Sequence, residues 1–267
     1  MSLIENLNPA FHEYFQSIYQ DRWPQIFQAL LQEPQHIHRP NQFYKPSGTV
    51  LPTYKMDPAS QIVAQAVDVQ PNDRVLDMCA APGGKSLILA EKLDSTGELI
   101  SNEFSASRRE RLMRVFREYI PQEQRQNVFV QGKDGQMFGI RTPDYFDRVL
   151  ADVPCSGERH LLENKSEFKK WTLKRTRNLA VRQFSLLSSA WLSCKDGGRI
   201  VYSTCSISPL ENDEVIRKLV DRRGVEILFP YADLLQGVLE KTEFGYQILP
   251  DKTGFGPMYF SVIVKKN

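Results

Sequence analysis

Two cysteines in short polar motifs are the strongest candidates for chemistry in this chain of 267 residues. Cys155 ends the sequence Asp-Val-Pro-Cys, and Cys205 is the third residue of Ser-Thr-Cys-Ser. Each motif follows an apolar segment that is expected to form a strand. If the two strands are parallel neighbours, both thiols lie at the same edge of a sheet. Two buried apolar cysteines, or a thiol pair that oxidises, are the alternatives.

A thiolate in such a place can activate a pyrimidine ring. Carbon 5 of a pyrimidine is a poor nucleophile, but a thiolate that adds to carbon 6 turns carbon 5 into an enamine-like carbon that can accept a methyl group. A second residue is then useful, because the carbon 5 proton must leave before the thiol is eliminated. A carboxylate close to ring nitrogen 3 would stabilise the adduct. Two thiols, one Asp and one Lys beside a methyl donor would fill every role.

A turn of small residues follows the first strand expected in the main part of the chain. Residues 74–85 read Arg-Val-Leu-Asp-Met-Cys-Ala-Ala-Pro-Gly-Gly-Lys, which indicates a strand, an abrupt turn and a helix. Gly83 and Gly84 have no side chain, so a ligand could approach the backbone closely. The helix would point unpaired N–H groups at that ligand. In an open α/β sheet a nucleotide-like cofactor binds at this turn, and a plain strand-to-helix turn is the alternative.

Acidic residues follow the first four expected strands. Asp77 and Asp152 end or follow the first and fourth expected strands. Asp134 follows the third strand, where its carboxylate could accept a hydrogen bond from an adenine amino group. Glu103 ends the second strand about twenty residues after Gly83, the expected place for a carboxylate that holds ribose hydroxyls. One such Asp is usually a helix cap. Four acids in register favour a shared pocket, and S-adenosylmethionine suits it better than a pyrophosphate, which carboxylates repel.

The elements that would position these residues alternate between strand and helix. Strands are expected at 74–77, 98–103, 127–130, 147–152, 199–202, 225–229 and 259–264, and helices include 106–119 and 178–193. Ser208 and Glu211 form a capping box, which predicts a further helix that begins at Pro209. The alternation predicts an α/β fold with a mostly parallel seven-stranded sheet and helices on both faces. Residues 57–267 are expected to form this domain, with a helix starting at Asp57.

Residues 1–56 are expected to form a helical extension and a connector. Asn8 and Pro9 are typical of a helix start, and two segments with aromatic stripes follow, which indicate core packing more than a binding face. Four prolines from Pro34 to Pro52 indicate an extended connector. It is a solvated loop or a strip that touches phosphates, and its two histidines make a poor metal site. The residues concerned are His36, His38, Arg39, Tyr44 and Lys45.

Composition narrows the class of protein. A formal net charge of +2 allows a nucleic-acid partner only through local basic surface. No apolar run is long enough to span a bilayer, and Glu5 and Glu13 make the N-terminus unlike a signal or transit peptide. Four cysteines in a chain of this length are not a disulfide framework. The expected compartment is therefore the reducing cytoplasm.

Taken together, the motifs resemble the Sun/Fmu family of RNA (cytosine-5)-methyltransferases. The resemblance rests on the turn at 76–85, on the two cysteine motifs at 152–155 and 203–206, and on Asp-Pro-Ala-Ser at 57–60 and Phe-Gly-Pro-Met-Tyr-Phe at 255–260. It extends over roughly residues 43–264. The Glu-Arg-His that follows Cys-Ser-Gly, with the Gly-Pro-Met-Tyr-Phe ending, is most similar to a compact branch known from mitochondrial ribosomal and transfer RNA enzymes.

The resemblance implies a class I, Rossmann-like methyltransferase fold and S-adenosylmethionine as the donor. It implies that Cys205 is the nucleophile, that Cys155 assists proton removal and product release, and that Asp152 and Lys85 lie beside the base and the donor. Cys79 is then a structural thiol of the loop, and Cys194, which has no motif, is expected to be packed. The family's cofactor contacts fall on Cys79, Ala80, Ala81, Pro82, Gly83, Gly84, Lys85, Glu103, Arg108, Asp134 and Asp152. No metal is expected.

The implied partner is RNA, with ribosomal RNA favoured over transfer RNA. Many bacterial members carry an added RNA-binding domain, whereas about 55 residues precede Asp57 here and almost nothing follows Val264. Target selection would then rest on the core, the N-terminal helices or an accessory RNA-binding protein, in a chain expected to be monomeric and away from membranes. The target base must be flipped to reach Cys205.

A basic segment after the Cys155 motif is the candidate contact with RNA, and a solvated charged face is its alternative. Phe168 and Trp171 interleave its basic residues, which are Lys165, Lys169, Lys170, Lys174, Arg175 and Arg177.

Three rival functions are considered. A non-catalytic RNA-binding or ribosome-assembly factor would not need the intact thiols, Lys85 and acids. A DNA cytosine methyltransferase would use the Pro-Cys thiol, Cys155, as its nucleophile. An amino-group methyltransferase is disfavoured because the fourth strand ends in Asp-Val-Pro-Cys and lacks the Asn/Asp-Pro-Pro-aromatic pattern.

Overall fold

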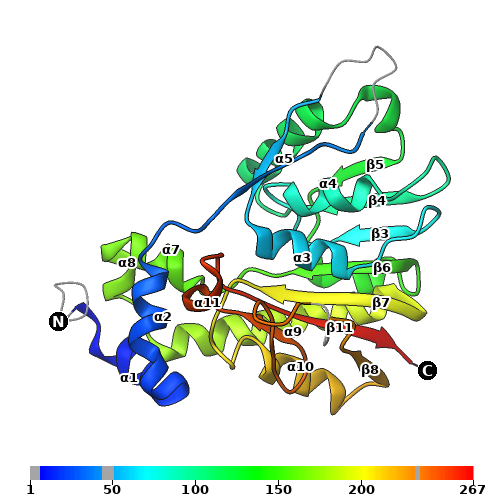
Figure 1. The fold of residues 1–267 in the computed structure, drawn as a ribbon. Coiled ribbons are helices and arrows are strands. Elements are labelled where there is room, and N and C mark those ends of the chain that lie inside the picture. Colours follow the sequence, from blue (N-terminus) through cyan, green and yellow to red (C-terminus); the bar gives the residue numbers. More distant parts are fainter. Residues whose placement is uncertain (1–6, 44–50, 232–234, 267) are drawn as a thin grey trace.

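A computed structural model describes residues 7–43, 51–231 and 235–266. Its centre is one large sheet with the strand order β5-β4-β3-β6-β7-β11-β10-β9, in which β8 also pairs with β11 (Figure 1). The parallel strands are β3 (Arg74–Asp77), β4 (Glu98–Asn102), β5 (Val128–Gln131), β6 (Phe146–Asp152) and β7 (Cys194–Thr204). The antiparallel edge consists of β8 (Val225–Leu228), β9 (Glu240–Lys241), β10 (Tyr246–Ile248) and β11 (Met258–Lys265).

The number of strands differs from the prediction. All seven expected strands are present, but β9 and β10 raise the number in the sheet to nine. Both additions contain at most three residues, which is too short for an alternating pattern to be visible in the sequence. The expected extended connector also contains strands, because β1 (Ile37–Arg39) and β2 (Tyr54–Met56) pair in a separate antiparallel sheet.

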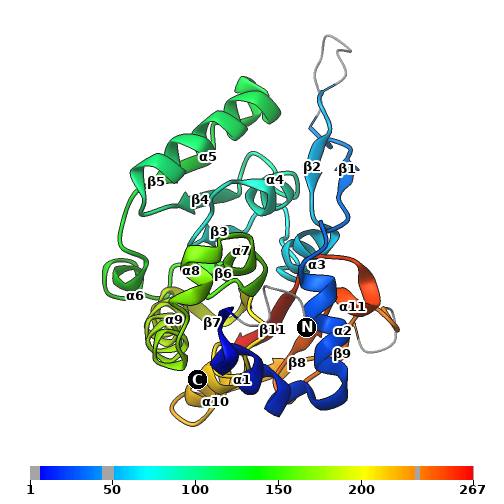
Figure 2. The same ribbon diagram turned by 90° about the vertical axis from the view of Figure 1, so that its left-hand side faces the viewer.

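Helices cover both faces of the large sheet, as predicted, because successive strand residues point to opposite sides. Val75 and Leu150 pack with the helices of one face, and Leu76 and Val149 pack with those of the other. Figure 2 shows α3 on one side of the sheet and α9 and α10 on the other. The first face is covered by α3 (Pro58–Ala66), α4 (Gly84–Ala90) and α5 (Ala106–Tyr119). The second is covered by α6 (Phe138–Arg141), α9 (Leu173–Ser193) and α10 (Asp213–Val220).

The N-terminal helices pack beyond the end of the sheet at which β7 finishes, on the left of Figure 1. Side chains of α1 (Pro9–Tyr19) and α2 (Trp23–Leu30) form a third apolar cluster with those that follow the Cys155 loop. Phe168 and Trp171 belong to this cluster, and both contact the ring of Phe11. They are buried, so the prediction that they interleave an RNA-binding surface is wrong. The remaining helices here are α7 (Glu158–Glu163), α8 (Lys165–Lys169) and α11 (Pro250–Thr253).

Helix starts were predicted with mixed success. Asn8 caps α1 and Asp57 caps α3, each followed by a proline, as expected. The helix expected at residue 178 begins at Leu173, where Thr172 Oγ1 accepts from the N–H of Arg175. The capping-box prediction is wrong, because α10 begins at Asp213 and the carboxylate of Glu211 is used elsewhere.

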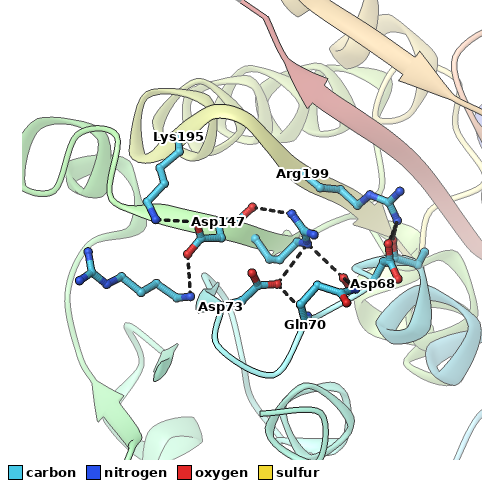
Figure 3. Close-up of polar contacts among 9 residues, drawn as sticks. Asp68, Gln70, Asp73, Asp147, Lys195 and Arg199 are labelled. Carbon is cyan, nitrogen blue, oxygen red and sulfur yellow. Dashed lines mark hydrogen bonds and ion pairs between the residues drawn. The ribbon is translucent and has the colours of Figure 1, made fainter. Parts of the chain in front are cut away.

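A network of charged side chains ties together the amino ends of β3, β6 and β7 (Figure 3). Asp147 is at its centre: Oδ2 accepts from the backbone N–H of Arg74 at 2.9 Å, and Oδ1 pairs with Lys195 Nζ at 2.5 Å. Nearby, Asp73 contacts Arg148 and Asp68 contacts Arg199. The network lies at the end of the parallel strands opposite the two cysteine motifs, so it stabilises the sheet without touching them.

Replacing Asp147 by Ala is expected to lower the free energy of unfolding by about 1–1.5 kcal/mol, because the exposed N–H of Arg74 exchanges a carboxylate acceptor for water and the ion pair with Lys195 is lost too. Urea denaturation followed by circular dichroism measures this change. The control is Lys195→Ala, which removes only the partly exposed ion pair and should cost under about 1 kcal/mol. Equal losses in the two variants would show that the backbone hydrogen bond is not the main contribution.

Candidate active site

The four predicted catalytic side chains lie together at the carboxyl end of the parallel strands. The pairing of β6 with β7, in which Asp152 is opposite Ser203, places the two cysteine motifs side by side. Cys155 Sγ and Cys205 Sγ are 2.7 Å apart, and Lys85 Nζ is 2.8 Å from Asp152 Oδ2. All four residues line one cavity of about 560 Å³. The topology thus turns motifs that are distant in the sequence into one site.

The carboxylate of Asp152 is held on both oxygens. Lys85 donates to Oδ2 and the hydroxyl of Ser203 donates to Oδ1 at 2.7 Å. Lys85 also donates to Ser60 Oγ at 3.2 Å, which links it to the Asp-Pro-Ala-Ser segment at the start of α3. Burial is the largest single effect on the pKa of Lys85 and lowers it, but the charge of Asp152, the hydrogen bond to it and the charge of Asp77 together raise the pKa above its usual value. The ammonium therefore stays charged beside the carboxylate.

The thiol of Cys155 is shaped by its contact with Cys205. A hydrogen bond to Cys205, followed by burial, raises the pKa of Cys155 well above its usual value. Cys155 therefore keeps its proton, and its Sγ accepts from the backbone N–H of Cys205 at 3.3 Å. Gly157 has a φ of +59°, and a Cβ there would lie 3.4 Å from Cys205 Sγ. A glycine at this position lets the chain turn into α7 next to the thiol.

The glycine-rich turn is shaped by protein packing. A Cβ on Gly83 would lie 3.0 Å from Leu112 Cδ1, and a Cβ on Gly84 would lie 2.6 Å from the ring of Tyr54. Side chains of α5 and β2 therefore pack where these Cβ atoms would lie, while Gly84 itself lines the smaller cavity beside the turn. Ala81, Pro82 and Lys85 of the same turn line the large cavity, and Cys79 lines it too. Ala80 lines the smaller cavity beside it.

The four strand-end acids do not form one shared pocket. Asp77 and Asp152 line the same cavity, whereas Asp134 lines a separate small cavity near Met137. The carboxylate of Asp134 accepts from the N–H of Gln136 at 3.1 Å, so it caps the following 3₁₀ turn. Glu103 is buried. The strands end on one edge, but their loops send these carboxylates to different places.

Glu103 and Arg108 connect α5 to the turn. Glu103 Oε1 accepts from the N–H of Ser105, and Oε2 is 3.3 Å from the guanidinium of Arg108. Arg108 also donates to the carbonyl of Ala81 at 3.0 Å, and it lines the large cavity. The ion pair with Glu103 therefore holds the guanidinium of Arg108 against the turn of residues 79–85, which carries Lys85.

Asp77 is a buried carboxyl with one oxygen unused. Oδ2 accepts from Ser86 Oγ at 2.6 Å, while Oδ1 has no hydrogen-bond partner among the residues that the structure describes. Burial raises the pKa of Asp77 to about 7. A buried polar atom that lines a cavity without a protein partner marks a place where a polar ligand group could bind.

Sequence reasoning missed three residues around the site. Asp57 was expected only as a helix cap, but its Oδ2 also accepts from the N–H of Gly256 at 2.6 Å and so holds the segment with Pro257 and Met258 at the cavity. Glu158 and Glu211 are fully buried beside the cysteine loops. The position of Glu211 in a Ser-Pro-Leu-Glu pattern was a signal, but it suggested a helix cap.

The connector and basic segment have mixed outcomes. His36 lines the large cavity, whereas Arg39 forms a two-fold ion pair with Glu91 and is not available to a phosphate. Tyr44 and Lys45 lie outside the described residues. Cys194 is buried, as expected. The basic residues on α8, α9 and between them are exposed, and they are Lys165, Lys169, Lys170, Lys174, Arg175 and Arg177.

No helix in the described part of the chain is long and apolar enough to cross a membrane. Among the same residues, no group of three potential His, Cys, Asp or Glu ligands has a geometry that could hold a metal ion.

Comparison with known proteins gives a consistent family. The family described as "16S rRNA methyltransferase RsmB/F" matches residues 64–264. The 5-cytosine rRNA methyltransferase NSUN4 of Bos taurus is 40% identical over 226 residues, which cover 78% of this chain and 58% of the relative. The mitochondrial tRNA (cytosine(34)-C(5))-methyltransferase of Danio rerio is 32% identical over 87% of this chain and 65% of its own length. The chain thus spans about 58% of the first of these relatives.

Solved structures agree on the fold. A methyltransferase homolog protein from Pyrococcus horikoshii superposes with a TM-score of 0.75 at 21% identity and covers 99% of this chain and 100% of its own. NSun6 from Pyrococcus horikoshii with SFG gives a TM-score of 0.66 at 23% identity, over 80% of this chain and 53% of that one. The Rossmann-like, class I methyltransferase fold and the resemblance read from the motifs are both confirmed.

Proposed function

We propose that this chain, which belongs to the RsmB/F methyltransferase family, transfers a methyl group from S-adenosylmethionine to carbon 5 of a cytosine in structured RNA. The observation that carries the proposal is the pair of thiols, 2.7 Å apart and in one cavity with the Lys85–Asp152 ion pair. A scaffold that only binds RNA has no need for this set of side chains. The relatives named above act on cytosine in ribosomal or transfer RNA.

The residues present suit S-adenosylmethionine. Asp77 lines the cavity at the turn, and its Oδ1, which has no hydrogen-bond partner among the described residues, can accept from an ammonium group. The bound donor would supply an electrophilic methyl group on a sulfonium. The residues proposed to hold it are the turn from Cys79 to Lys85, together with Glu103, Arg108, Asp134 and Asp152. Asp134 lines a different cavity from the one at the turn.

The proposed mechanism assigns one role to each reactive side chain. The thiolate of Cys205 adds to carbon 6 of the flipped cytosine, and the electron pair of the ring double bond moves toward carbon 5, which takes the methyl group. Asp152, held by Lys85 and Ser203, contacts the polar edge of the ring and stabilises the adduct. A base then takes the carbon 5 proton, a step that Cys155 assists. The electron pair left on carbon 5 re-forms the ring double bond, the bond between carbon 6 and sulfur breaks, and Cys205 leaves as its thiolate.

The proposed substrate is ribosomal RNA, because the family description and the first relative name rRNA. Transfer RNA is the alternative, since another relative acts on it. The exposed lysines and arginines of α8 and α9 would contact phosphates, and residues 1–56, or an accessory RNA-binding protein, would add to target selection. We further propose that the protein acts as a monomer in the cytoplasm.

Bisulfite sequencing of RNA tests the substrate. Ribosomal and transfer RNA, transcribed without modification, are incubated with the protein and the donor, and converted cytosines are compared with those that resist conversion. We expect resistance at one or few cytosines of ribosomal RNA, dependent on the donor. Resistance confined to transfer RNA would replace the proposed substrate, and none in either RNA with the donor present would contradict the proposed reaction.

A further inference from the structure

Two buried glutamates beside the thiols have no role in the mechanism above. Glu158 is the first residue of α7, and Glu211 lies in the turn before α10. Both are fully buried. Their hydrogen-bond partners among the described residues are serines, one amide and backbone N–H groups. Burying an ionised carboxyl without a counter-charge costs free energy, so these two side chains favour a state with less than two negative charges.

Both glutamates contact the serine that follows each cysteine. Ser156 Oγ lies 2.5 Å from Glu158 Oε1 and 2.5 Å from Glu211 Oε1. Ser206 Oγ lies 3.0 Å and 3.3 Å from the same two oxygens. The two serine hydroxyls are themselves 3.2 Å apart. The glutamates therefore join the loop that carries one thiol to the loop that carries the other.

The hydrogen atoms available imply that the cluster holds an extra proton. The four serine–carboxyl contacts and the serine–serine contact have only two hydroxyl hydrogens to share. With both carboxyls ionised, at least two of the serine–carboxyl contacts would place lone pairs against each other. A proton on one carboxyl turns one of these contacts into a hydrogen bond and removes the repulsion between two buried charges.

The surroundings show which carboxyl is the acid. Glu211 Oε2 accepts from Ser156 N at 2.9 Å and from Gln183 Nε2 at 2.7 Å, which stabilises a negative charge. Glu158 Oε2 accepts from Ile207 N at 3.0 Å. Burial, and then the charge of Glu211, raise the pKa of Glu158 to about 7. Burial raises the pKa of Glu211 as well, but the donors on its Oε2 oppose this, so below about pH 7 the shared proton lies on Glu158.

The other titratable groups that face the pair come from three elements and the cysteine loops. On α1 they are Tyr14 and Tyr19, whose pKa values burial raises. Burial also raises the pKa of Tyr202 on β7, whose hydroxyl donates to the carbonyl of Glu211. The thiol of Cys155 completes the set, and Arg177 of α9 acts through its charge on Tyr14. The tyrosines stay neutral, so they do not supply a counter-charge for a second carboxylate.

We propose that Glu158 and Glu211 are positioning residues that share one proton and hold the two thiols at their working distance. The inference rests on the proposed function, because that function makes the sulfur–sulfur distance matter. Without the bridge, the loop of Cys155 is free to move away from Cys205. Release of the product, which needs both side chains, would slow even though neither glutamate touches the base.

Methyl transfer is the first test, and Glu158→Ala is the first variant. The turnover number should fall on the order of 10- to 100-fold, with the dissociation constant for S-adenosylmethionine unchanged in calorimetry. Glu158→Gln should restore turnover to near that of the unaltered protein, because the amide N–H replaces the acid proton. Glu163→Gln, on the exposed side of the same helix, is the matched control and should have no effect.

Thermal unfolding tests the shared proton. The folded-state pKa of Glu158 is raised to about 7, above the value of about 4.3 for an exposed Glu. The stabilisation is therefore complete below the unfolded value and is lost as the pH rises through 7. Relative to Glu158→Gln, the unaltered protein should lose Tm between pH 5 and pH 8. A Tm difference that does not change with pH would overturn the shared proton.

Cross-linking of the thiols tests the geometry without the reaction. Diamide, an azo oxidant, takes two hydrogens and two electrons from Cys155 and Cys205, so a disulfide forms and the azo bond becomes a hydrazine. Its rate, followed by peptide mass spectrometry, should fall in Glu158→Ala and recover in Glu158→Gln. Equal cross-linking and turnover in all variants would overturn the positioning role. If cross-linking is slow in Glu158→Ala but the unaltered protein does not methylate cytosine, the positioning role stands and only the proposed function is contradicted.

Discussion

Replacing Cys205 by Ala is expected to abolish methyl transfer to RNA, with a loss on the order of 10⁴-fold or more. Without the sulfur that adds to carbon 6, carbon 5 of cytosine stays a poor nucleophile, and no other effect in the site compensates. Transfer of tritiated methyl from the donor to RNA measures the rate. Binding of S-adenosylmethionine, measured by calorimetry, should remain, because the predicted donor contacts are on the turn from Cys79 to Lys85 and on nearby acids.

The control for this variant is Cys194→Ala. Cys194 is also a buried thiol, but it packs at the start of β7, away from the cavity. The variant Cys194→Ala should keep the turnover number of the unaltered protein, although its free energy of unfolding should fall modestly. Unchanged turnover in Cys205→Ala would contradict the assignment of the nucleophile. If Cys155→Ala were the inactive variant instead, the chemistry would follow the pattern of a DNA cytosine methyltransferase.

Replacing Cys155 by Ala is expected to trap the protein on its RNA. Addition by Cys205 and methyl transfer would still occur, but elimination would be slow because the thiol 2.7 Å away is missing. A slowly migrating protein–RNA band should appear on a denaturing gel in the presence of the donor. The amount of trapped RNA should approach one molecule per protein molecule, and the variant should not turn over more than once.

The double variant Cys155→Ala, Cys205→Ala controls for this result and should give no band, since the covalent bond needs the sulfur of Cys205. Digestion of the band and mass spectrometry should place the RNA on Cys205. Rapid turnover with no adduct in Cys155→Ala would show that another group assists release, and the role of Cys155 would be wrong.

Much of the fold was predictable because its signals are local. The helix at 106–119 has the predicted limits, and each of the seven expected strands is present. Parallel order followed from strand–helix alternation, which requires crossovers. Parallel order of β6 and β7 is sufficient to bring Cys155 and Cys205 to the same edge of the sheet.

The errors come from contacts between distant residues. Phe168 and Trp171 fit an RNA-binding pattern, but α1 covers them. Gly83 fits a ligand turn, yet Leu112 and Val115 of α5 pack against the place where its Cβ would lie. In each case, the identity of the packing partner depended on elements far away in the chain.

The sequence by itself determined the chemistry that is available: two thiols in family motifs, a lysine and strand-end acids, with the family that they indicate. Tertiary structure decided which of these groups meet. It brought Lys85 to Asp152, separated Asp134 from the cavity, and placed Glu158 against Glu211. The physical reason is that residue types and strand ends are local properties, whereas a buried carboxyl takes its partners, and its proton, from whichever loops fold around it.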